Sequence, residues 1–101
     1  MIDIEQALVV ITIVPNLEEP LIDWLLAREQ PTGFTSMPVF GHGSRHEYLS
    51  TAEQVSGRQR RVQFQIEMAM DRVEPFLQEL RADFEGAHMR YRIQPLYSPS
   101  A

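Results

Sequence analysis

The residues with the most chemical potential lie in a polar stretch, residues 41–59, that begins with Gly41, His42 and Gly43. Backbone amides of a glycine-rich turn can form a concave donor site for anion oxygens, and arginines add charge-assisted hydrogen bonds. The arginines considered for this role are Arg45, Arg58 and Arg60. The stretch predicts an anion or nucleotide site, with a basic loop that is merely solvated as the alternative.

Two histidines in the same stretch stand four residues apart, and a glutamate follows the second: His42, His46 and Glu47. On a helix, imidazoles at this spacing would share one face and could chelate Zn²⁺ or Cu²⁺. Gly41 and Gly43 disfavour a helix there, and in a loop such histidines are commonly solvent-exposed. A metal site and a plain solvated loop both remain open.

The composition argues against several classes of function. The net charge of -5 disfavours a nucleic-acid binder, because such proteins need a basic face to displace counterions from phosphates. With no cysteine, the chain has no thiolate nucleophile and no cysteine-bound zinc. Ser50 and Ser56 lack the context of a nucleophile elbow, so we expect a protein that is not an enzyme.

The chain of 101 residues predicts one domain, residues 1–101, with a single core. Residues 1–5 lack the basic start and apolar run of a signal peptide, and no apolar stretch approaches the roughly 20 residues of a membrane span. We therefore expect a cytoplasmic location. The tail, residues 98–101, is expected to be loose.

Hydrophobic patterning indicates four extended segments. The predicted strands are residues 7–14, 34–40, 61–68 and about 88–96. The first is a nearly continuous β-branched run, typical of a central strand, and the third alternates apolar and polar residues. Pro38 and Pro95 place the second and fourth segments at edges, because proline cannot donate to a ladder on both sides.

Two predicted helices begin in the same way. The matching residues are Asn16 and Asp71 as caps, Glu19 and Glu74 as partners in a capping box, and Pro20 and Pro75 in the first turn. Each pair differs by one offset, since 71−16, 74−19 and 75−20 all equal 55. In the first helix, Leu21 and Leu25 should face the protein core, and Arg28 should point outward. Gly86 should end the second helix.

Strand, capped helix and strand thus occur twice, which predicts an α+β, ferredoxin-like βαββαβ sandwich. Its four-stranded antiparallel sheet has the order 4-1-3-2, with both helices on one face. The other face would carry Gln63, Gln65, Arg90 and Arg92 beside Val9 or Val10. A mixed face of this kind is commonly covered by another copy, so we expect a homo-oligomer, with a solvated polar face as the alternative.

Three stretches carry a resemblance to known proteins: residues 33–36 (GFTS), 41–47 (GHGSRHE) and 52–62 (AEQVSGRQRRV). They resemble the second strand, T-loop and third strand of PII-type signalling proteins and the related CutA-like group. More closely, they look like a bacterial PII-like family known only as a domain of unknown function (DUF3240-like). The resemblance covers nearly the whole chain.

This resemblance implies a trimer with ligand sites between subunits and a mobile T-loop, residues 41–59, that contacts a partner protein. It places Gly41, Gly43 and Arg45 at the T-loop base near a ligand's phosphates. The full set of predicted ligand-binding residues is Gly41, Gly43, Arg45, Gly57, Arg58 and Arg60. The chain has no lysine, and residues 83–88 lack the phosphate loop of PII proteins, which argues against ATP binding of the PII type.

The leading hypothesis is a non-enzymatic PII-like sensor or adaptor that binds a small anion or nucleotide and signals to a partner. The alternative is a metal-binding accessory of a heavy-metal efflux system, because similar family members accompany such systems. It would use His42, His46 and Glu47 and could contact a membrane efflux protein. A purely structural oligomer is a third reading. The sequence does not identify the ligand.

Overall fold

The computed structural model describes residues 2–29, 31, 33–43 and 58–99. Its strands are β1 (Ile2–Ile13), β2 (Phe34–Gly41), β3 (Gln59–Ala69) and β4 (Arg90–Pro99). Its helices are α1 (Glu18–Leu26) and α3 (Val73–Asp83). The tail prediction is wrong for Ser98 and Pro99, which pair with Asp3 and Ile2 because β1 begins earlier than its apolar run suggested.

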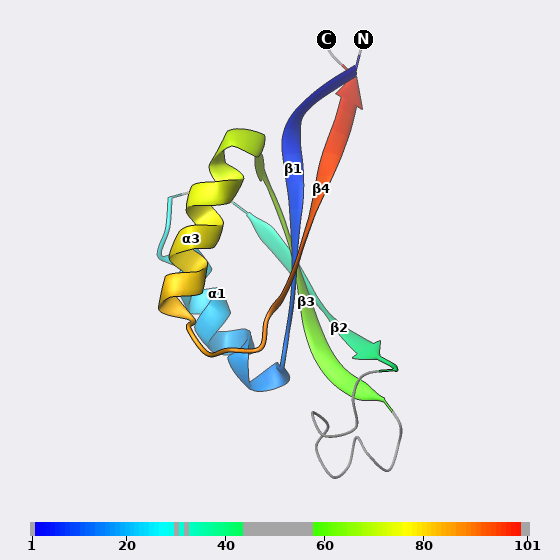
Figure 1. Cartoon of the computed structure of the whole chain (residues 1–101), viewed down its shortest axis with the longest axis vertical. Helices are drawn as coiled ribbons and strands as arrows, with labels where there is room; N and C mark the ends of the chain where they lie inside the picture. Colours follow the sequence, from blue (N-terminus) through cyan, green and yellow to red (C-terminus); the bar gives the residue numbers. More distant parts are fainter. Residues whose placement is uncertain (1, 30, 32, 44–57, 100–101) are drawn as a thin grey trace.

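The four strands form one antiparallel sheet of order β2-β3-β1-β4, which is the predicted order 4-1-3-2 read from the opposite edge. Both helices lie on one face of this sheet (Figure 1). The fold is therefore the α+β, ferredoxin-like sandwich expected from the sequence. Pro38 and Pro95 lie in the two edge strands, as predicted.

The core lies between the helices and the sheet. Alternate residues of β1 and β3 point into it and are almost fully buried: Ala7, Val9, Ile11, Ile13, Val62, Phe64, Ile66 and Met68. The helices contribute Leu21, Leu25, Val73, Phe76 and Leu80. Burial of one large apolar side chain contributes about 1.5–3 kcal/mol, so this layer supplies the main drive for folding.

The predicted capping boxes are wrong. Neither helix start has a side-chain cap hydrogen bond, because Asn16 and Asp71 lie inside 3-10 turns that precede the α-helices. These turns are Pro15–Leu17 and Met70–Arg72. The offset is nevertheless real: the turns begin at residues 15 and 70 and the helices at 18 and 73, so 70−15 and 73−18 both equal 55.

A cluster of four side chains joins the two helices, and we call it the α1–α3 cluster: Trp24, Arg28, Glu79 and Asp83. Trp24 Nε1 donates to Asp83 Oδ2 at 2.7 Å. The Arg28 guanidinium lies 3.3 Å from the centre of the Trp24 ring and forms ion pairs of 3.3 Å with both Glu79 and Asp83. Arg28 was predicted to point outward, but the neighbouring helix brings two carboxylates to it.

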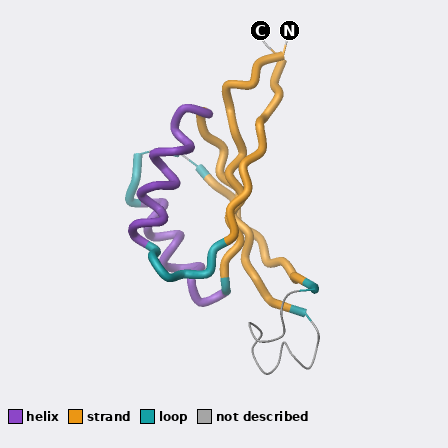
Figure 2. The backbone as a smooth tube through the Cα atoms, viewed as in Figure 1, coloured by secondary structure: helices purple, strands orange, loops and turns teal. Residues whose placement is uncertain are grey.

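The other face of the sheet is not covered by any described element (Figure 2). On this face of β1, Val10 is buried, whereas Leu8 and Thr12 are half-buried. Gln63 and Gln65 of β3 lie on the same face, opposite Thr12 and Val10. The mixed polar and apolar face expected from the sequence is therefore present. Separately, none of the described helices is long and apolar enough to cross a membrane.

Candidate ligand-binding site

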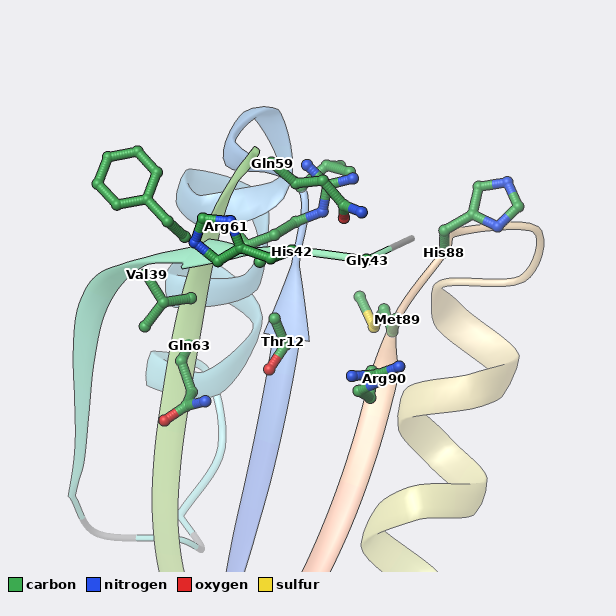
Figure 3. A pocket seen from close by; sticks show the side chains of 13 residues that line it. Thr12, Val39, His42, Gly43, Gln59, Arg61, Gln63, His88, Met89 and Arg90 are labelled. Atoms are coloured by element: carbon green, nitrogen blue, oxygen red, sulfur yellow. The ribbon is translucent and has the colours of Figure 1, made fainter. Parts of the chain in front are cut away.

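A pocket of about 850 Å³ lies at one end of the uncovered sheet face, and we call it the sheet-end pocket (Figure 3). Its lining residues are Thr12, Val14, Val39, Phe40, Gly41, His42, Gly43, Gln59, Arg61, Gln63, His88, Met89 and Arg90. Pockets that bind small molecules commonly enclose about 300–1,000 Å³. This one is large enough for an organic ligand.

Strand pairing explains why distant residues meet in this pocket. Thr12, near the end of β1, is opposite Gln63 of β3 on one side and Arg90 of β4 on the other. Cross-strand partners share a face of the sheet, so these three side chains form one row. The first part of β3, the first residue of β4 and the last part of β1 therefore build the floor together.

The rim is completed by a turn after α3. Gly86 has a φ of +83°, a left-handed conformation that only glycine adopts without strain. The Ala87 amide donates to the Phe84 carbonyl at 3.1 Å, and the chain then reverses toward β4. This turn brings His88 and Met89 to the pocket, across from His42 in the close view (Figure 3).

The sheet-end pocket is basic in an acidic chain. Arg61 and Arg90 line it, and no aspartate or glutamate is among the described residues that do. The whole chain carries a net charge of -5. Charges of one sign in a concave site concentrate counter-ions there, so the pocket favours an anion over a cation.

Gln59 is the only polar residue among the described ones that is classed as buried, with 7% of its surface exposed. Its Nε2 has no hydrogen-bond partner within the described part of the chain. A buried donor left unpaired costs about 1–3 kcal/mol, so native structures rarely retain one without a reason. Gln59 therefore contributes a donor at this pocket that the described part of the chain leaves unsatisfied.

Gly41 and Gly43 have different structural roles: one packs against a neighbouring side chain, and the other adopts a positive φ. Gly43 has a φ of +81°, which a residue with a Cβ adopts only with strain. Gly41 lies opposite Gln59 in the last cross-strand pair of β2 and β3. A Cβ placed on Gly41 would lie 3.6 Å from Gln59 Oε1. Gly43 thus permits a turn, whereas Gly41 packs against the buried glutamine.

The predicted site residues have different positions. Gly41, His42 and Gly43 line the sheet-end pocket, whereas Arg58 and Arg60 do not. The Arg58 guanidinium lies 4.7 Å from the centre of the Phe40 ring. Arg60 pairs with Phe40 in the sheet, and alternation places it on the core-facing side with Val62.

Four predicted residues, Arg45, His46, Glu47 and Gly57, lie outside the described residues. Within the described ranges, no group of three His, Cys, Asp or Glu side chains could hold a metal ion. The roles assigned to these four residues stay predictions.

Sequence reasoning did not assign Gln59, Arg61, His88 or Arg90 to a site. The sheet order itself was the signal that could have found three of them. In the order 4-1-3-2, the start of the third strand and the start of the fourth both lie beside the end of the first. Gln59, Arg61 and Arg90 occupy those starts.

Comparison with known proteins gives a family and a fold. The model of the family described as "Protein of unknown function (DUF3240)" matches residues 4–99. A crystal structure of a DUF3240 family protein from Shewanella baltica OS155 superposes with a TM-score of 0.75 at 18% identity, covering 96% of both chains. In a comparison with curated proteins, none matches the chain.

Structures of CutA from Synechococcus elongatus PCC7942 are also similar to the chain. One superposes with a TM-score of 0.70 at 13% identity, covering 97% of this chain and 83% of that one. A second, complexed with a Bis-Tris molecule, has a TM-score of 0.70 at 12% identity, covering 98% and 88%. At these identities the likeness establishes a shared fold.

Proposed function

Because this chain belongs to the DUF3240 family of proteins of unknown function and shares the fold of CutA, we propose that it is a non-enzymatic, cytoplasmic PII-like sensor. It binds a small anion in the sheet-end pocket and communicates with a partner protein through the connection between β2 and β3. This connection contains the T-loop-like segment 41–59 predicted from the sequence.

The position of the sheet-end pocket supports this proposal most directly. His42 and Gly43, where the connection leaves β2, line the pocket, and so do Gln59 and Arg61, where it enters β3. A ligand in the pocket therefore contacts both ends of the same connection. Binding can then favour one arrangement of the connection over another, because ligands shift conformational equilibria through differential contacts.

Self-association through the uncovered face of the sheet belongs to the same proposal. Val10 and Leu8 of β1 lie on this face, and so does Met37 of β2, which is 37% exposed and is separated from them by β3. Both edges, β2 and β4, also present free backbone groups, which another copy can satisfy. We propose a homo-oligomer, a trimer by the resemblance, in which a neighbouring copy closes the open side of the sheet-end pocket.

Anion binding can be tested by titration. Isothermal calorimetry with inorganic phosphate, nucleotides and dicarboxylates should detect binding to the wild type. Arg61→Ala and Arg90→Ala should each weaken it by about 1.5–3 kcal/mol, as expected for a charge-assisted hydrogen bond. Arg92→Ala is the matched control, because Arg92 lies on the same strand and face as Arg90 but outside the pocket lining. Equal affinities for all four proteins would contradict the proposal.

The metal-binding alternative is tested by adding Zn²⁺, Cu⁺ and Ag⁺ to the same series. Of its three residues, the structure describes only His42, which is exposed at the rim of the sheet-end pocket. A His42→Ala/His46→Ala double variant should lose metal affinity if this alternative holds. Unchanged metal affinity in the double variant would contradict the metal-binding alternative. It would not bear on the anion-binding proposal, which the separate titration tests.

A further inference from the structure

We propose that Gln59 is the residue that recognises the ligand of the sheet-end pocket, and that this ligand is an oxyanion, a carboxylate or a phosphate. One of its oxygens accepts a hydrogen bond from the Gln59 side-chain amide, while Arg61 and Arg90 balance its charge. The inference rests on the proposed function, since it specifies the chemistry of the same site.

The first support is the unpaired amide. Gln59 lines the pocket, is 7% exposed, and has an Nε2 without a partner in the described part of the chain. A buried amide donor without an acceptor destabilises the folded protein. Such a group is therefore expected where a ligand supplies the missing acceptor, as at a binding site.

The second support is the kind of polar group around it. A guanidinium has five N–H donors and no acceptor, and Arg61 and Arg90 both line the pocket with Gln59. Arg61 follows Gln59 by two residues on β3, so the two side chains emerge on the same face about 7 Å apart along the strand. Two arginines and an amide N–H₂ match a group with several acceptor oxygens and repel a metal cation.

The third support is how the glutamine is held. Its Oε1 lies against Gly41, at 3.6 Å from the position of an added Cβ. The terminal torsion of glutamine has a broad energy profile, so the amide can turn its Nε2 toward an acceptor without any shift of β3. Recognition by Gln59 therefore takes place at the last pair between β2 and β3, where the connection begins and ends.

The test combines binding with stability. Gln59→Met keeps the length of the side chain and removes the amide, and Gln59→Glu keeps its shape but replaces the donor with a negative charge. The matched control is Gln65→Met, on the same strand and face but outside the pocket lining. The probes are inorganic phosphate and malonate, which separate the two oxyanion classes, with chloride as the reference anion.

We expect Gln59→Met to bind the preferred oxyanion about tenfold more weakly, the loss typical of one hydrogen bond to a charged group. Its thermal midpoint should stay the same or rise, because an unpaired buried donor is gone. Gln59→Glu should abolish binding. In NMR spectra, the side-chain NH₂ pair that is lost in Gln59→Met should shift in the wild type on addition of the oxyanion.

Three outcomes would overturn the inference, and they are distinguishable. If the arginine variants lose affinity but Gln59→Met and Gln65→Met both retain it, the anion site is supported but Gln59 does not donate to the ligand. If the wild type binds neither phosphate nor malonate nor any other oxyanion, the proposed function fails together with the inference. A lowered thermal midpoint in Gln59→Met with unchanged affinity would assign Gln59 a structural role only.

Discussion

The α1–α3 cluster and the sheet-end pocket both contain arginine, but the groups around the arginine differ. In the cluster, Arg28 lies between two carboxylates and over an aromatic ring, and the Trp24 N–H has a carboxylate acceptor. In the pocket, Arg61 and Arg90 share the lining with Gln59, whose Nε2 is unpaired in the described structure.

This difference is the one expected between a structural cluster and the proposed binding site. Groups that satisfy one another contribute to stability and need nothing from outside the chain. Basic groups that line a concave site favour an anion there, and no aspartate or glutamate is among the described residues that line this pocket. Substitutions in the cluster should therefore change stability, whereas those in the pocket should change binding.

Trp24→Ala should give the largest stability loss of the substitutions considered. Trp24 packs edge-on against Phe76 and Phe84, with ring centres 5.6 and 6.0 Å apart, and carries Arg28 on its face. Truncation of a packed tryptophan costs about 3–5 kcal/mol, and its partial exposure sets the expectation near the lower end. Urea unfolding measures this loss.

The control for Trp24→Ala lies in the pocket. Arg90→Ala should change the free energy of unfolding by no more than about 0.5 kcal/mol, as is usual for an exposed side chain. Similar losses for the two variants would mean that the pocket arginine is structural, and the contrast between the regions would disappear.

The sequence predicted one region better than the other. The alternation of Val62, Phe64, Ile66 and Met68 fixed the core face of β3, because a period of two is a local property of a strand. The site depends on pairing instead: Thr12 meets Gln63 and Arg90, which are far apart along the chain. Residues 41–59 alone do not contain these three residues, so local reasoning about that stretch could not predict the pocket.

Two further features could not be read from local patterns. Gln59 is buried opposite Gly41 in the last pair of β2 and β3, and nothing in the types of these two residues requires that burial. The position of Arg28 follows from how the two helices pack together, which brings Glu79 and Asp83 to it. Helical periodicity gives the face of a residue but not its neighbour on another helix.

Gly43→Ala should have the next largest effect on stability. Gly43 has a φ of +81°, and the left-handed conformation costs a residue with a Cβ about 1–2 kcal/mol. Gly86→Ala, at a φ of +83° in the turn before β4, should cost a similar amount. Urea unfolding should give comparable losses for the two. No loss in Gly43→Ala would mean that the turn at the pocket rim adopts another conformation in solution.

Asp83→Asn tests the charge matching of the α1–α3 cluster. It removes the ion pair with Arg28 but keeps an oxygen that can accept from Trp24 Nε1. Because the Asp83 side chain is 54% exposed, solvent screening limits the loss to about 0.5 kcal/mol. The loss should shrink in high salt. Asp71→Asn is the control, since Asp71 makes no cap hydrogen bond, and an equal effect there would mean that the loss at Asp83 does not come from its ion pair.

Gly41→Ala should have a small effect on stability, and its sign should be opposite to that of Gly43→Ala. Gly41 has no positive φ, and an added Cβ would meet Gln59 at ordinary contact distances of 3.6–3.8 Å. At such a position, alanine restricts the unfolded chain and stabilises the fold by about 0.4–1 kcal/mol. Urea unfolding measures the gain. The same methyl group would occupy space beside the Gln59 amide and restrict its rotation toward a ligand, so oxyanion affinity should fall although stability rises. If stability and oxyanion affinity both fell, Gly41 would have a structural role in the sheet. This end of the sheet would then resemble the α1–α3 cluster, where substitutions change stability.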